Sequence, residues 1–376
     1  MNILILHGSS DLYGASNVLL NVIKVLLNNG DKPIVVLSES GPLSEKLINQ
    51  NVEVHIIRLG ILRRKYFSPL GLMNRIAVMK TAGTLLRKLC EEKKIEVIYS
   101  HTSAVLIGAL IAKKLKKRHI WQILEITTKP LFFVRAMAWL LNNYSETIIT
   151  ASDAVKNHWK KWVDEDKLKT IYNGLDCSPY EDRTGNLRQE LNMPSTCVLI
   201  GMIGRVHFWK GQDYFIKIAA SLLKLNPNIR FIMAGDAFPG YEYLYAQNQK
   251  LIDDEKINDK IINLGYREDV LNIMNSLDIF ISPSTQPDPF PTVILEAMAA
   301  NKPIIATAHG GALEMLKNNI SGLLIPLNNP DEAAKIILPL TLLEQRRLEM
   351  GDKGGERIRT LFSYTAFANS VVQTFK

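Results

Sequence analysis

Residues 286–301 place one acidic side chain in a proline-rich turn and a second in an apolar helix. The prolines fix φ and bias their neighbours away from helix, so the chain should stay extended until about Thr292. A helix start leaves its first N–H groups unpaired and can hold a phosphate. Asp288 and Glu296 would serve poorly as phosphate ligands but well as acceptors for sugar or ribose hydroxyl groups. The alternative without a ligand is a buried Glu in a core helix and an Asp in a proline turn.

A second segment, residues 204–211, follows a predicted strand and reads Gly-Arg-Val-His-Phe-Trp-Lys-Gly. Gly204 lets the backbone approach a ligand closely. Arg205 and Lys210 supply two cations at the carboxyl end of the strand, where open α/β folds bind ligands. A solvated loop before a helix fits the same residues, so this segment is informative mainly together with residues 286–301.

Apolar runs alternate with amphipathic stretches along the whole chain. They predict strands at residues 3–6, 33–37, 52–57, 95–99, 119–124, 146–150 and 168–172. A polar stretch at 173–185 reads as a hinge, after which strands are predicted at 198–203, 230–234, 260–264, 278–282, 303–306 and 322–325. The principal helices are expected at 18–26, 70–94, 104–115, 131–141, 213–225, 270–276 and 364–375. This alternation predicts an α/β fold with parallel, doubly wound sheets.

Length and composition fit a globular chain of two domains, because 376 residues exceed one ordinary core. Hydrophobic residues make up 47% and charged residues 22%, as in soluble proteins. No apolar run approaches a membrane span, and the N-terminus lacks the basic region of a signal peptide. The three cysteines have no metal or redox spacing. We therefore expect a protein of the reducing cytoplasm.

Positive charge is concentrated in the first half. Residues 1–177 hold 25 Lys and Arg against 15 Asp and Glu, a net charge of +10, whereas residues 178–376 hold 20 against 22, a net charge of −2. No nucleic-acid motif or stacking-aromatic pattern accompanies the basic clusters, so we expect no nucleic-acid partner. An anionic membrane surface is the partner that we expect for the basic first half.

The spacing of Asp288 and Glu296, with Phe290 between them, resembles the acidic-x7-Glu motif of the retaining GT-B glycosyltransferases of family 4. This family, the glycosyl transferases of group 1, includes bacterial polysaccharide and O-antigen enzymes. Residues 204–211 resemble its Gly-Arg…Lys-Gly pair, and the Asn-Gly-Leu-Asp of residues 173–176 resembles its turn at the end of the first domain.

The resemblance covers nearly the whole chain and implies the GT-B fold, in which two Rossmann-like domains face each other across a cleft. Residues 1–177 would form the acceptor-side domain, and residues 178–362 would bind the nucleotide-sugar donor. Residues 363–376 would form a helix that crosses back to the first domain.

The resemblance also implies roles in the second domain. Glu296 would bind the ribose and Asp288 the donor sugar, while Tyr266 and Arg267 lie where the family contacts the base. The two cations of residues 204–211 and the helix start would stabilise the leaving diphosphate in place of a divalent ion, so we expect no metal and no cofactor. The expected donor-binding residues are Gly14, Gly204, Arg205, Lys210, Tyr266, Arg267, Asp288, Phe290, Pro291, Thr292, Val293 and Glu296. The expected catalytic residues are Glu125, Asp288, Arg205 and Lys210.

An acidic triplet at residues 164–166 resembles the metal motif of the other large transferase fold only superficially. It precedes a predicted strand, whereas that motif follows one. We therefore predict a solvated turn there.

Three residues of the first domain are further candidates. Gly14 opens a helix and would face the donor diphosphate, although the family has Gly-Gly where this chain has Tyr-Gly. His101 follows a strand and would bind the acceptor, but a capping histidine fits equally well. Glu125 follows the next strand and would orient the acceptor hydroxyl or stabilise charge at the anomeric carbon. An ion pair with Lys129 is the structural alternative for Glu125.

The chain departs from the family pattern at three of these positions. Asp288 is one methylene shorter than the usual Glu. Pro291 stands where glycine is common and removes one N–H from the phosphate site. Glu125 replaces a histidine found in many members. The first and third departures would alter the choice of sugar and the handling of the acceptor, or together mark an inactive relative.

The sequence thus predicts a cytoplasmic, metal-independent, retaining hexosyltransferase. It would move a sugar from a UDP, GDP or dTDP donor onto a lipid-linked glycan acceptor at the inner face of the cell membrane, in polysaccharide synthesis. Two alternatives stay open. One is a nucleotide-sugar epimerase of the same fold, which would need no acceptor. The other is a non-catalytic subunit that binds a nucleotide sugar or a partner transferase.

Overall fold

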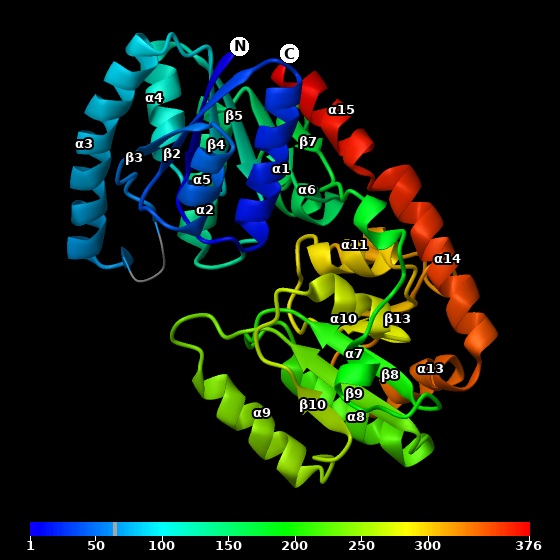
Figure 1. The fold of residues 1–376 in the computed structure, drawn as a ribbon. Helices are drawn as coiled ribbons and strands as arrows, with labels where there is room; N and C mark the ends of the chain where they lie inside the picture. The colour runs from blue at the N-terminus through cyan, green and yellow to red at the C-terminus, as the bar shows by residue number, and fades with distance from the viewer. Residues whose placement is uncertain (63–65) are drawn as a thin grey trace. The chain divides into compact units, whose positions relative to one another are not determined.

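The computed structural model describes residues 1–62 and 66–376, and the chain forms two compact units (Figure 1). The first unit contains Met1–Asn173 and Phe367–Lys376, and the second contains Gly174–Ala366. The chain therefore leaves the first unit and returns to it at its end. The predicted domain limits, after residues 177 and 362, each lie four residues from these boundaries.

A parallel sheet of seven strands forms the centre of the described part of the first unit, in the order β3-β2-β1-β4-β5-β6-β7. Its central strands are buried almost throughout, because helices cover both faces, and they therefore read as continuous apolar runs. The strands are β1 Asn2–His7, β2 Lys32–Leu37, β3 Glu53–Ile56, β4 Val97–His101, β5 Arg118–Ile123, β6 Thr147–Thr150 and β7 Leu168–Thr170.

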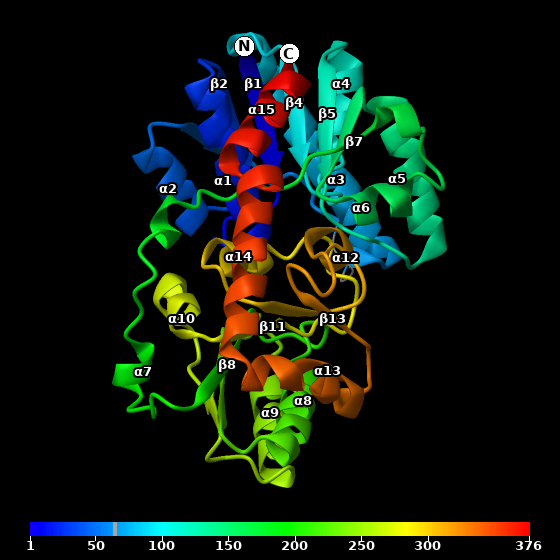
Figure 2. The ribbon, with the colours of Figure 1, turned by 90° about the vertical axis from the view of Figure 1, so that its right-hand side faces the viewer.

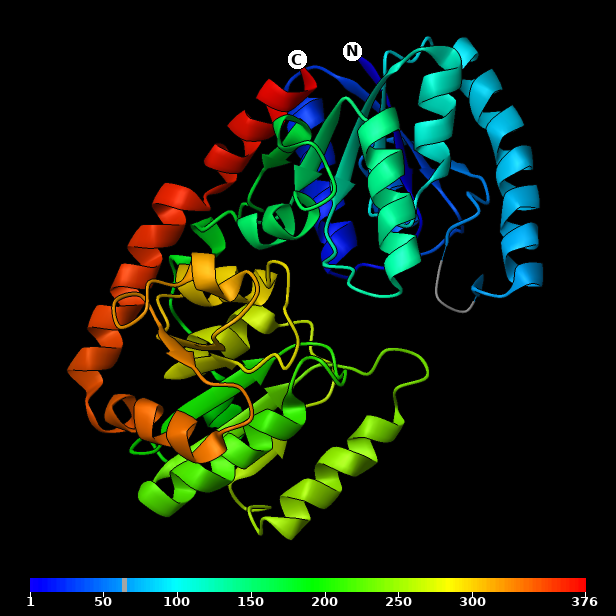
Figure 3. The same cartoon turned by 180° about the vertical axis from the view of Figure 1, so that it is seen from behind.

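Helices α3, α4 and α5 lie side by side on one face of this sheet, α3 against α4 and α4 against α5 (Figure 3). The last helix, α15, reaches the sheet at β4 and β5 (Figure 2). There the ring of Phe375 lies 5.4 Å from the ring of Tyr99, and Arg118 Nη1 donates to the Phe375 oxygen at 3.0 Å. The helices are α1 Gly14–Asn28, α2 Pro42–Asn49, α3 Pro69–Glu92, α4 Ile107–Leu115, α5 Leu131–Tyr144, α6 Asp153–Trp159 and α15 Tyr364–Phe375.

The second unit is built around a parallel sheet of six strands among the described residues, in the order β10-β9-β8-β11-β12-β13. The strands are β8 Val198–Ile203, β9 Ile229–Ala234, β10 Ile261–Asn263, β11 Ile279–Ser282, β12 Ile304–Thr307 and β13 Leu323–Ile325. The helices are α7 Leu187–Glu190, α8 Gln212–Leu225, α9 Tyr243–Asp254, α10 Val270–Ser276, α11 Thr292–Ala299, α12 Ala312–Met315, α13 Pro330–Leu342 and α14 Glu344–Leu361.

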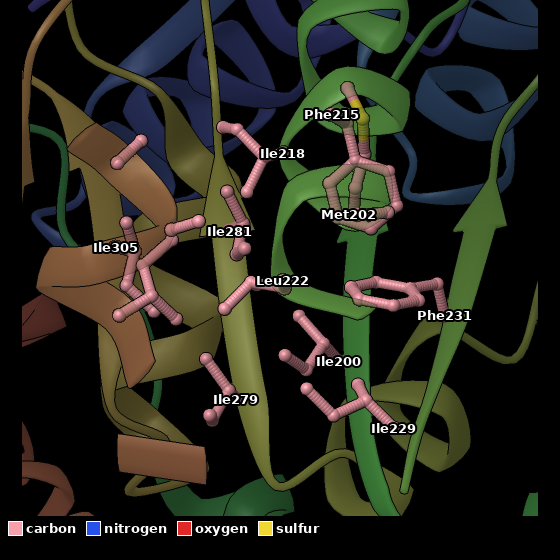
Figure 4. Packing of buried hydrophobic residues seen from close by; sticks show 14 of the residues in the cluster. Ile200, Met202, Phe215, Ile218, Leu222, Ile229, Phe231, Ile279, Ile281 and Ile305 are labelled. Carbon is pink, nitrogen blue, oxygen red and sulfur yellow. The ribbon is translucent and has the colours of Figure 1, made fainter. Parts of the chain in front are cut away.

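The core of the second unit lies between its sheet and the helices α8 and α13 (Figure 4). Phe215, Ile218 and Leu222 project from α8 onto Ile200 of β8 and Ile281 of β11, and all five side chains are fully buried. Phe231 of β9 meets Phe215 edge-on, with ring centroids 5.8 Å apart. This core fixes the strand ends from which the candidate site is built.

The predicted fold class is confirmed, because both units are parallel sheets with helices between the strands. The helix expected from about Thr292 begins at that residue. The sequence analysis assigned no helix to α2, α6, α7, α9, α12 or α14. Helix α14 is strongly polar and carries three glycines, a composition that disfavours helix in isolation. Those glycines allow a close approach, since a Cβ at Gly351 would lie 1.9 Å from the Asn301 oxygen, just past the end of α11.

Candidate active site

The loop after β8 is fixed by hydrogen bonds to the end of β9. Gly204 N–H donates to the Ala234 oxygen at 2.9 Å, and Val206 N–H donates to the Asp236 oxygen at 2.8 Å. Gly235 has a φ of +143°, and a Cβ there would lie 2.0 Å from the Gly204 oxygen. Glycine is therefore required for the two loops to approach each other at the carboxyl edge of the sheet.

Arg205, the first predicted cation, lies on this loop. Its guanidinium carbon is 4.9 Å from the ring centroid of Phe238, a cation–π contact. The side-chain amide of Gln212 donates to the Arg205 backbone oxygen at 2.9 Å. The backbone and the side chain of Arg205 are thus both held at the carboxyl end of β8.

The loop ends at Gly211, whose φ of +80° is rarely adopted by other residues. A Cβ there would lie 2.0 Å from the Pro283 oxygen. Thr285 reinforces the contact. Its N–H donates to the Trp209 oxygen at 2.7 Å, and its hydroxyl donates to the Phe208 oxygen at 3.0 Å. The loop after β11 is therefore packed against the loop after β8.

This packing joins the second predicted cation to the first predicted carboxylate. Lys210 Nζ lies 2.5 Å from Asp288 Oδ2, and both side chains are partly exposed. The sequence analysis assigned Lys210 to the diphosphate and Asp288 to the sugar, and the structure brings the two groups together as an ion pair. Each retains hydrogen-bonding capacity, because an ammonium has three donors and a carboxylate several lone pairs. The pair can therefore meet a ligand that carries phosphate and hydroxyl groups side by side.

A glycine pair after β12 holds the backbone of Asp288. Gly311 N–H donates to the Asp288 oxygen at 2.8 Å, and a Cβ at Gly310, where φ is +61°, would lie 2.4 Å from the same oxygen. His309 Nε2 lies 2.6 Å from the Ser284 oxygen and fixes the base of this loop. The sequence analysis did not name this segment, whose signal is His-Gly-Gly directly after a strand.

The start of α11 offers backbone donors. Pro291 has no N–H to contribute. Thr292 and Val293 are half-buried, and their N–H groups have no acceptor in the part of the chain that the structure describes. Two donors thus remain for an anion at this helix start. The side chain of Phe290, a predicted donor-binding residue, is instead buried edge-on against Phe362, with centroids 5.6 Å apart, so it anchors the loop to the core.

Glu296 lies one turn further along α11 and is half-buried. Its carboxylate has no hydrogen-bond partner among residues 1–62 and 66–376, and burial raises its pKa to about 7. The nearby charge of Glu296 also helps to raise the pKa of the Tyr180 phenol, after the larger effect of burial. An unpaired carboxylate in this position can accept hydrogen bonds from hydroxyl groups.

The two predicted base contacts differ from each other. Arg267 is bound by two carboxylates: its Nη1 donates to Glu190 Oε1 at 2.6 Å, and its Nη2 donates to Asp269 Oδ2 at 2.6 Å. These partners raise the pKa of Arg267 further above its ordinary value. Arg267 therefore holds the turn after β10, whereas the neighbouring Tyr266 is 64% exposed and remains available to a ligand.

In the first unit, Gly14 begins α1 and has open space around it, since a Cβ there would meet nothing within 4 Å. His101 is fully buried, in contrast to the predicted acceptor contact. It ends β4 in the centre of the sheet, and its Nδ1 lies 3.2 Å from Nδ1 of His7. Burial lowers the pKa of both histidines, that of His7 to about 4. His101 is therefore a neutral core residue whose side chain is not available to an acceptor.

Glu125 follows β5 and is half-buried. Its Oε2 accepts the N–H groups of Ser103 at 3.2 Å and Leu124 at 3.1 Å, and within the described residues no ion pair joins it to Lys129. Burial raises the pKa of this carboxyl against the opposing effect of its hydrogen bonds. The structure therefore does not show the alternative of an ion pair with Lys129. Backbone N–H groups hold the Glu125 carboxylate instead.

The acidic triplet is a solvated turn, as predicted, with Glu165–Lys167 forming one 3₁₀ turn before β7. Glu165 pairs with Lys156 at 3.4 Å. Across the residues that are described, no group of three or more His, Cys, Asp and Glu side chains is arranged to hold a metal ion. In the same residues, no helix has the length and apolar character of a membrane span.

Two family models match the chain. The model "Glycosyltransferase Family 4" matches residues 13–179, and the model "Glycosyl transferases group 1" matches residues 184–357.

The relatives include a glycosyltransferase whose name contains a lipid-linked acceptor. A UDP-Gal:alpha-D-GlcNAc-diphosphoundecaprenol alpha-1,3-galactosyltransferase of Escherichia coli is 25% identical over 348 residues, which cover 88% of this chain and 85% of that protein. An uncharacterized glycosyltransferase of Methanocaldococcus jannaschii is 28% identical over 212 residues, 54% of this chain and 52% of that protein.

Solved structures share the fold of the whole chain. Anabaena HepE in complex with UDP is 24% identical, with a TM-score of 0.86 over 100% of this chain and 99% of that chain. WaaG, a glycosyltransferase involved in lipopolysaccharide biosynthesis, is 14% identical, with a TM-score of 0.71 over 99% and 98% of the two chains.

Proposed function

This chain belongs to the glycosyltransferases of group 1 and family 4, and from that membership we propose that it transfers a hexose from a nucleoside diphosphate donor to a lipid-linked glycan. The transfer would retain the configuration at the anomeric carbon and require no metal. It would take place in the cytoplasm at the inner face of the cell membrane, in the synthesis of a surface polysaccharide.

The observation that carries the proposal is the contact between Lys210 and Asp288 beside the start of α11. A nucleoside diphosphate sugar presents a phosphate and a sugar hydroxyl a few bonds apart, and this pair offers a cation and a hydroxyl acceptor side by side. Glu296 supplies a second, unpaired carboxylate on the same helix, suited to the two hydroxyl groups of a ribose.

The mechanism follows from where charge develops. When the bond between the anomeric carbon and the diphosphate oxygen breaks, the leaving group gains negative charge. Lys210, Arg205 and the N–H groups of Thr292 and Val293 would stabilise that charge, an effect often worth several kcal/mol when the donors are preorganised. The acceptor hydroxyl oxygen forms the new bond to the anomeric carbon, and its proton passes to the departing phosphate oxygen or to Glu125.

The donor nucleotide that we propose is UDP. The name of the Escherichia coli relative contains UDP-Gal, and that relative aligns with 88% of this chain. The same name contains a diphosphoundecaprenol acceptor, which supports a lipid-linked acceptor here. The family matches favour a transferase over the alternatives of an epimerase or a non-catalytic subunit, because both halves of the chain match transferase models.

Donor binding is tested by a thermal-shift screen of UDP, GDP and dTDP and their sugars, with EDTA present. A ligand that binds the folded state raises the midpoint, so UDP should raise it without metal. Lys210→Ala should remove most of that shift and lower transfer from the best donor by about 100-fold or more. The matched control is Lys217→Ala, an exposed lysine on α8. If no nucleotide shifts the wild-type midpoint, or if Lys210→Ala transfers as fast as wild type, the proposed site is wrong.

The retaining stereochemistry is tested on the product. Proton NMR of the new glycosidic bond should show the anomeric configuration of the donor sugar. An inverted product would overturn the retaining mechanism while leaving the transferase assignment intact.

A further inference from the structure

Four aromatic rings gather in the second unit, directly beside Lys210. Three successive residues of the loop after β8 are aromatic: His207, Phe208 and Trp209. The centroid of the His207 ring lies 4.3 Å from that of Phe208 and 5.0 Å from that of Trp209. Tyr241, from the loop before α9, places its ring centroid 4.3 Å from that of His207. We define these four residues as the aromatic platform.

The aromatic platform lies outside the core of the second unit. Phe208 is 47% exposed and Trp209 is 42% exposed, and neither belongs to the cluster of buried residues between the sheet and α8. Burial of large aromatic rings is a strong source of stability, and these two rings contribute little of it. The loop is held instead by the backbone hydrogen bonds to Asp236 and Thr285. The exposed faces of the rings are therefore open to a ligand.

Polar atoms at the edges of the rings are also unused. The indole N–H of Trp209 and the hydroxyl of Tyr241 have no hydrogen-bond partner among residues 1–62 and 66–376. Burial, followed by the charges of Arg205 and Lys210, lowers the pKa of His207, so this ring is neutral. The aromatic platform thus combines uncharged, apolar faces with hydrogen-bonding edges.

A sugar ring has the complementary chemistry. Its C–H groups form an apolar face with partial positive charge, which suits the electron-rich face of an aromatic ring. Its hydroxyl groups form a polar rim, which can bind an indole N–H or a phenol. A nucleobase can also stack on an aromatic ring, so the test below separates these two ligands.

The place of the aromatic platform decides which sugar it can meet. The proposed reaction brings two sugars to this edge of the sheet, the donor sugar and the end of the acceptor glycan. We assign the donor sugar to Asp288, whose backbone is held by the glycine pair after β12. The rings belong to the loops after β8 and β9 instead. The acceptor glycan is the sugar that remains for them.

We propose that the aromatic platform binds the acceptor glycan by stacking against one of its sugar rings. The proposal rests on the proposed function, which supplies the glycan. It goes beyond that function because the acceptor contacts predicted from the sequence, His101 and Glu125, belong to the first unit. The unit that binds the donor would then also hold part of the acceptor.

Saturation-transfer NMR tests the stacking without requiring the natural acceptor. The protein is mixed with excess UDP, which fills the donor site, and with the methyl glycosides of glucose, galactose, mannose, N-acetylglucosamine, rhamnose and fucose. At least one glycoside should receive saturation, most strongly at the C–H protons of one ring face. Trp209→Ala and Phe208→Ala should each lower the affinity for that glycoside by about threefold to tenfold, since each removes one stacking ring.

Two further variants serve as controls. Trp209→Phe keeps a ring at this position and should retain most of the affinity. Trp139→Ala removes a tryptophan that is 56% exposed on α5 of the first unit, and it should bind the glycoside like wild type. The UDP thermal shift of both platform variants, Trp209→Ala and Phe208→Ala, should equal that of wild type, which shows that Lys210 in the same loop is undisturbed.

The aromatic platform is not a glycan site if no glycoside receives saturation, or if Trp209→Ala and Phe208→Ala bind the glycoside as tightly as wild type. Loss of the UDP shift in both alanine variants, with glycoside binding unchanged, would assign the rings to the nucleobase and overturn the proposal.

The same measurements separate this inference from the proposed function. A wild-type UDP shift without saturation of any glycoside overturns only the aromatic platform. Absence of a UDP shift, together with glycoside binding that Trp209→Ala weakens, overturns the donor site and leaves the aromatic platform as a glycan site.

Discussion

At the residue scale, we expect Glu296 to couple ligand binding to pH. Burial raises its pKa from 4.5 to about 7, so between these values the folded protein holds a proton that the unfolded chain has lost. The folded state binds more protons in this window, and the free energy of unfolding therefore falls as the pH rises through it. A ligand with hydroxyl groups would donate hydrogen bonds to the ionised carboxylate of Glu296.

We therefore expect Glu296→Gln to raise the thermal midpoint at about pH 8, where the buried charge is removed, and to change it little at about pH 5. Affinity for UDP should increase with pH through about 7 in wild type and lose that dependence in the variant. Calorimetric titration at several pH values measures the affinity. A wild-type affinity that is flat between about pH 5.5 and 8.5 would contradict the assignment of Glu296 to the ribose.

We expect substitution of Asp288 to separate binding of the diphosphate from transfer of the sugar. Its carboxylate forms an ion pair with Lys210 at 2.5 Å, and it adds a negative charge where the diphosphate should lie. Asp288→Asn should tighten UDP binding by about threefold to tenfold, because it frees Lys210. It should lower sugar transfer by about 100-fold, because the amide is a weaker hydroxyl acceptor. Titration with UDP and a transfer assay measure the two effects. If the UDP affinity and the transfer rate fall together, Asp288 does not hold the sugar.

The sequence predicted which residues bear charge in the site but not how they pair. Lys210 and Asp288 are 78 positions apart, and only the packing of the two loops through Gly211 brings them into contact. Arg267 was predicted to contact a base, yet Glu190, 77 positions away, binds it. His101 was predicted to bind an acceptor, but its side chain is fully buried beside His7. Long-range neighbours decide these roles, and one sequence does not display them.

At the scale of elements, Gly211 determines where the loop after β8 can go. It shares a φ near +80° with Gly30, at the end of α1, but only Gly211 would bring a Cβ to 2.0 Å from another backbone oxygen, that of Pro283. Both alanine variants should incur the cost of a left-handed residue, about 1–2 kcal/mol. Gly211→Ala alone should also displace Lys210 and abolish the UDP thermal shift. A UDP shift equal in Gly211→Ala and Gly30→Ala would show that the loop tolerates the displacement.

Strands were easier to predict than helices in this chain. Parallel strands covered on both faces read as short apolar runs, and every predicted run became a strand. Helix α14 could not be recognised because its glycines, Gly351, Gly354 and Gly355, serve contact with a neighbour and disfavour helix locally. Helix α3 was predicted as one long helix over residues 70–94. None of residues 69–81, its first half, is buried.

At the scale of the whole molecule, the first unit depends on residues 367–376. Phe375 is 1% exposed and lies against Tyr99 in the central strand β4. Phe375→Ala should lower the stability of the first unit by about 3–5 kcal/mol, the usual cost of removing a buried aromatic ring. The UDP shift of the second unit should persist. Gln373→Ala, at an exposed position of the same helix, is the control. Denaturation followed by intrinsic fluorescence, with and without UDP, distinguishes the two units.

The return of residues 367–376 to the first unit also sets an order of events during synthesis. Domains usually fold one after another from the N-terminus as the chain emerges from the ribosome. Here the first-made unit lacks Phe375 and the hydrogen bond from Arg118 until residues 367–376 have left the ribosome. The second unit, made later, is complete before the first. A translation arrest soon after Ala366 would therefore leave a finished second unit tethered to an unfinished first unit.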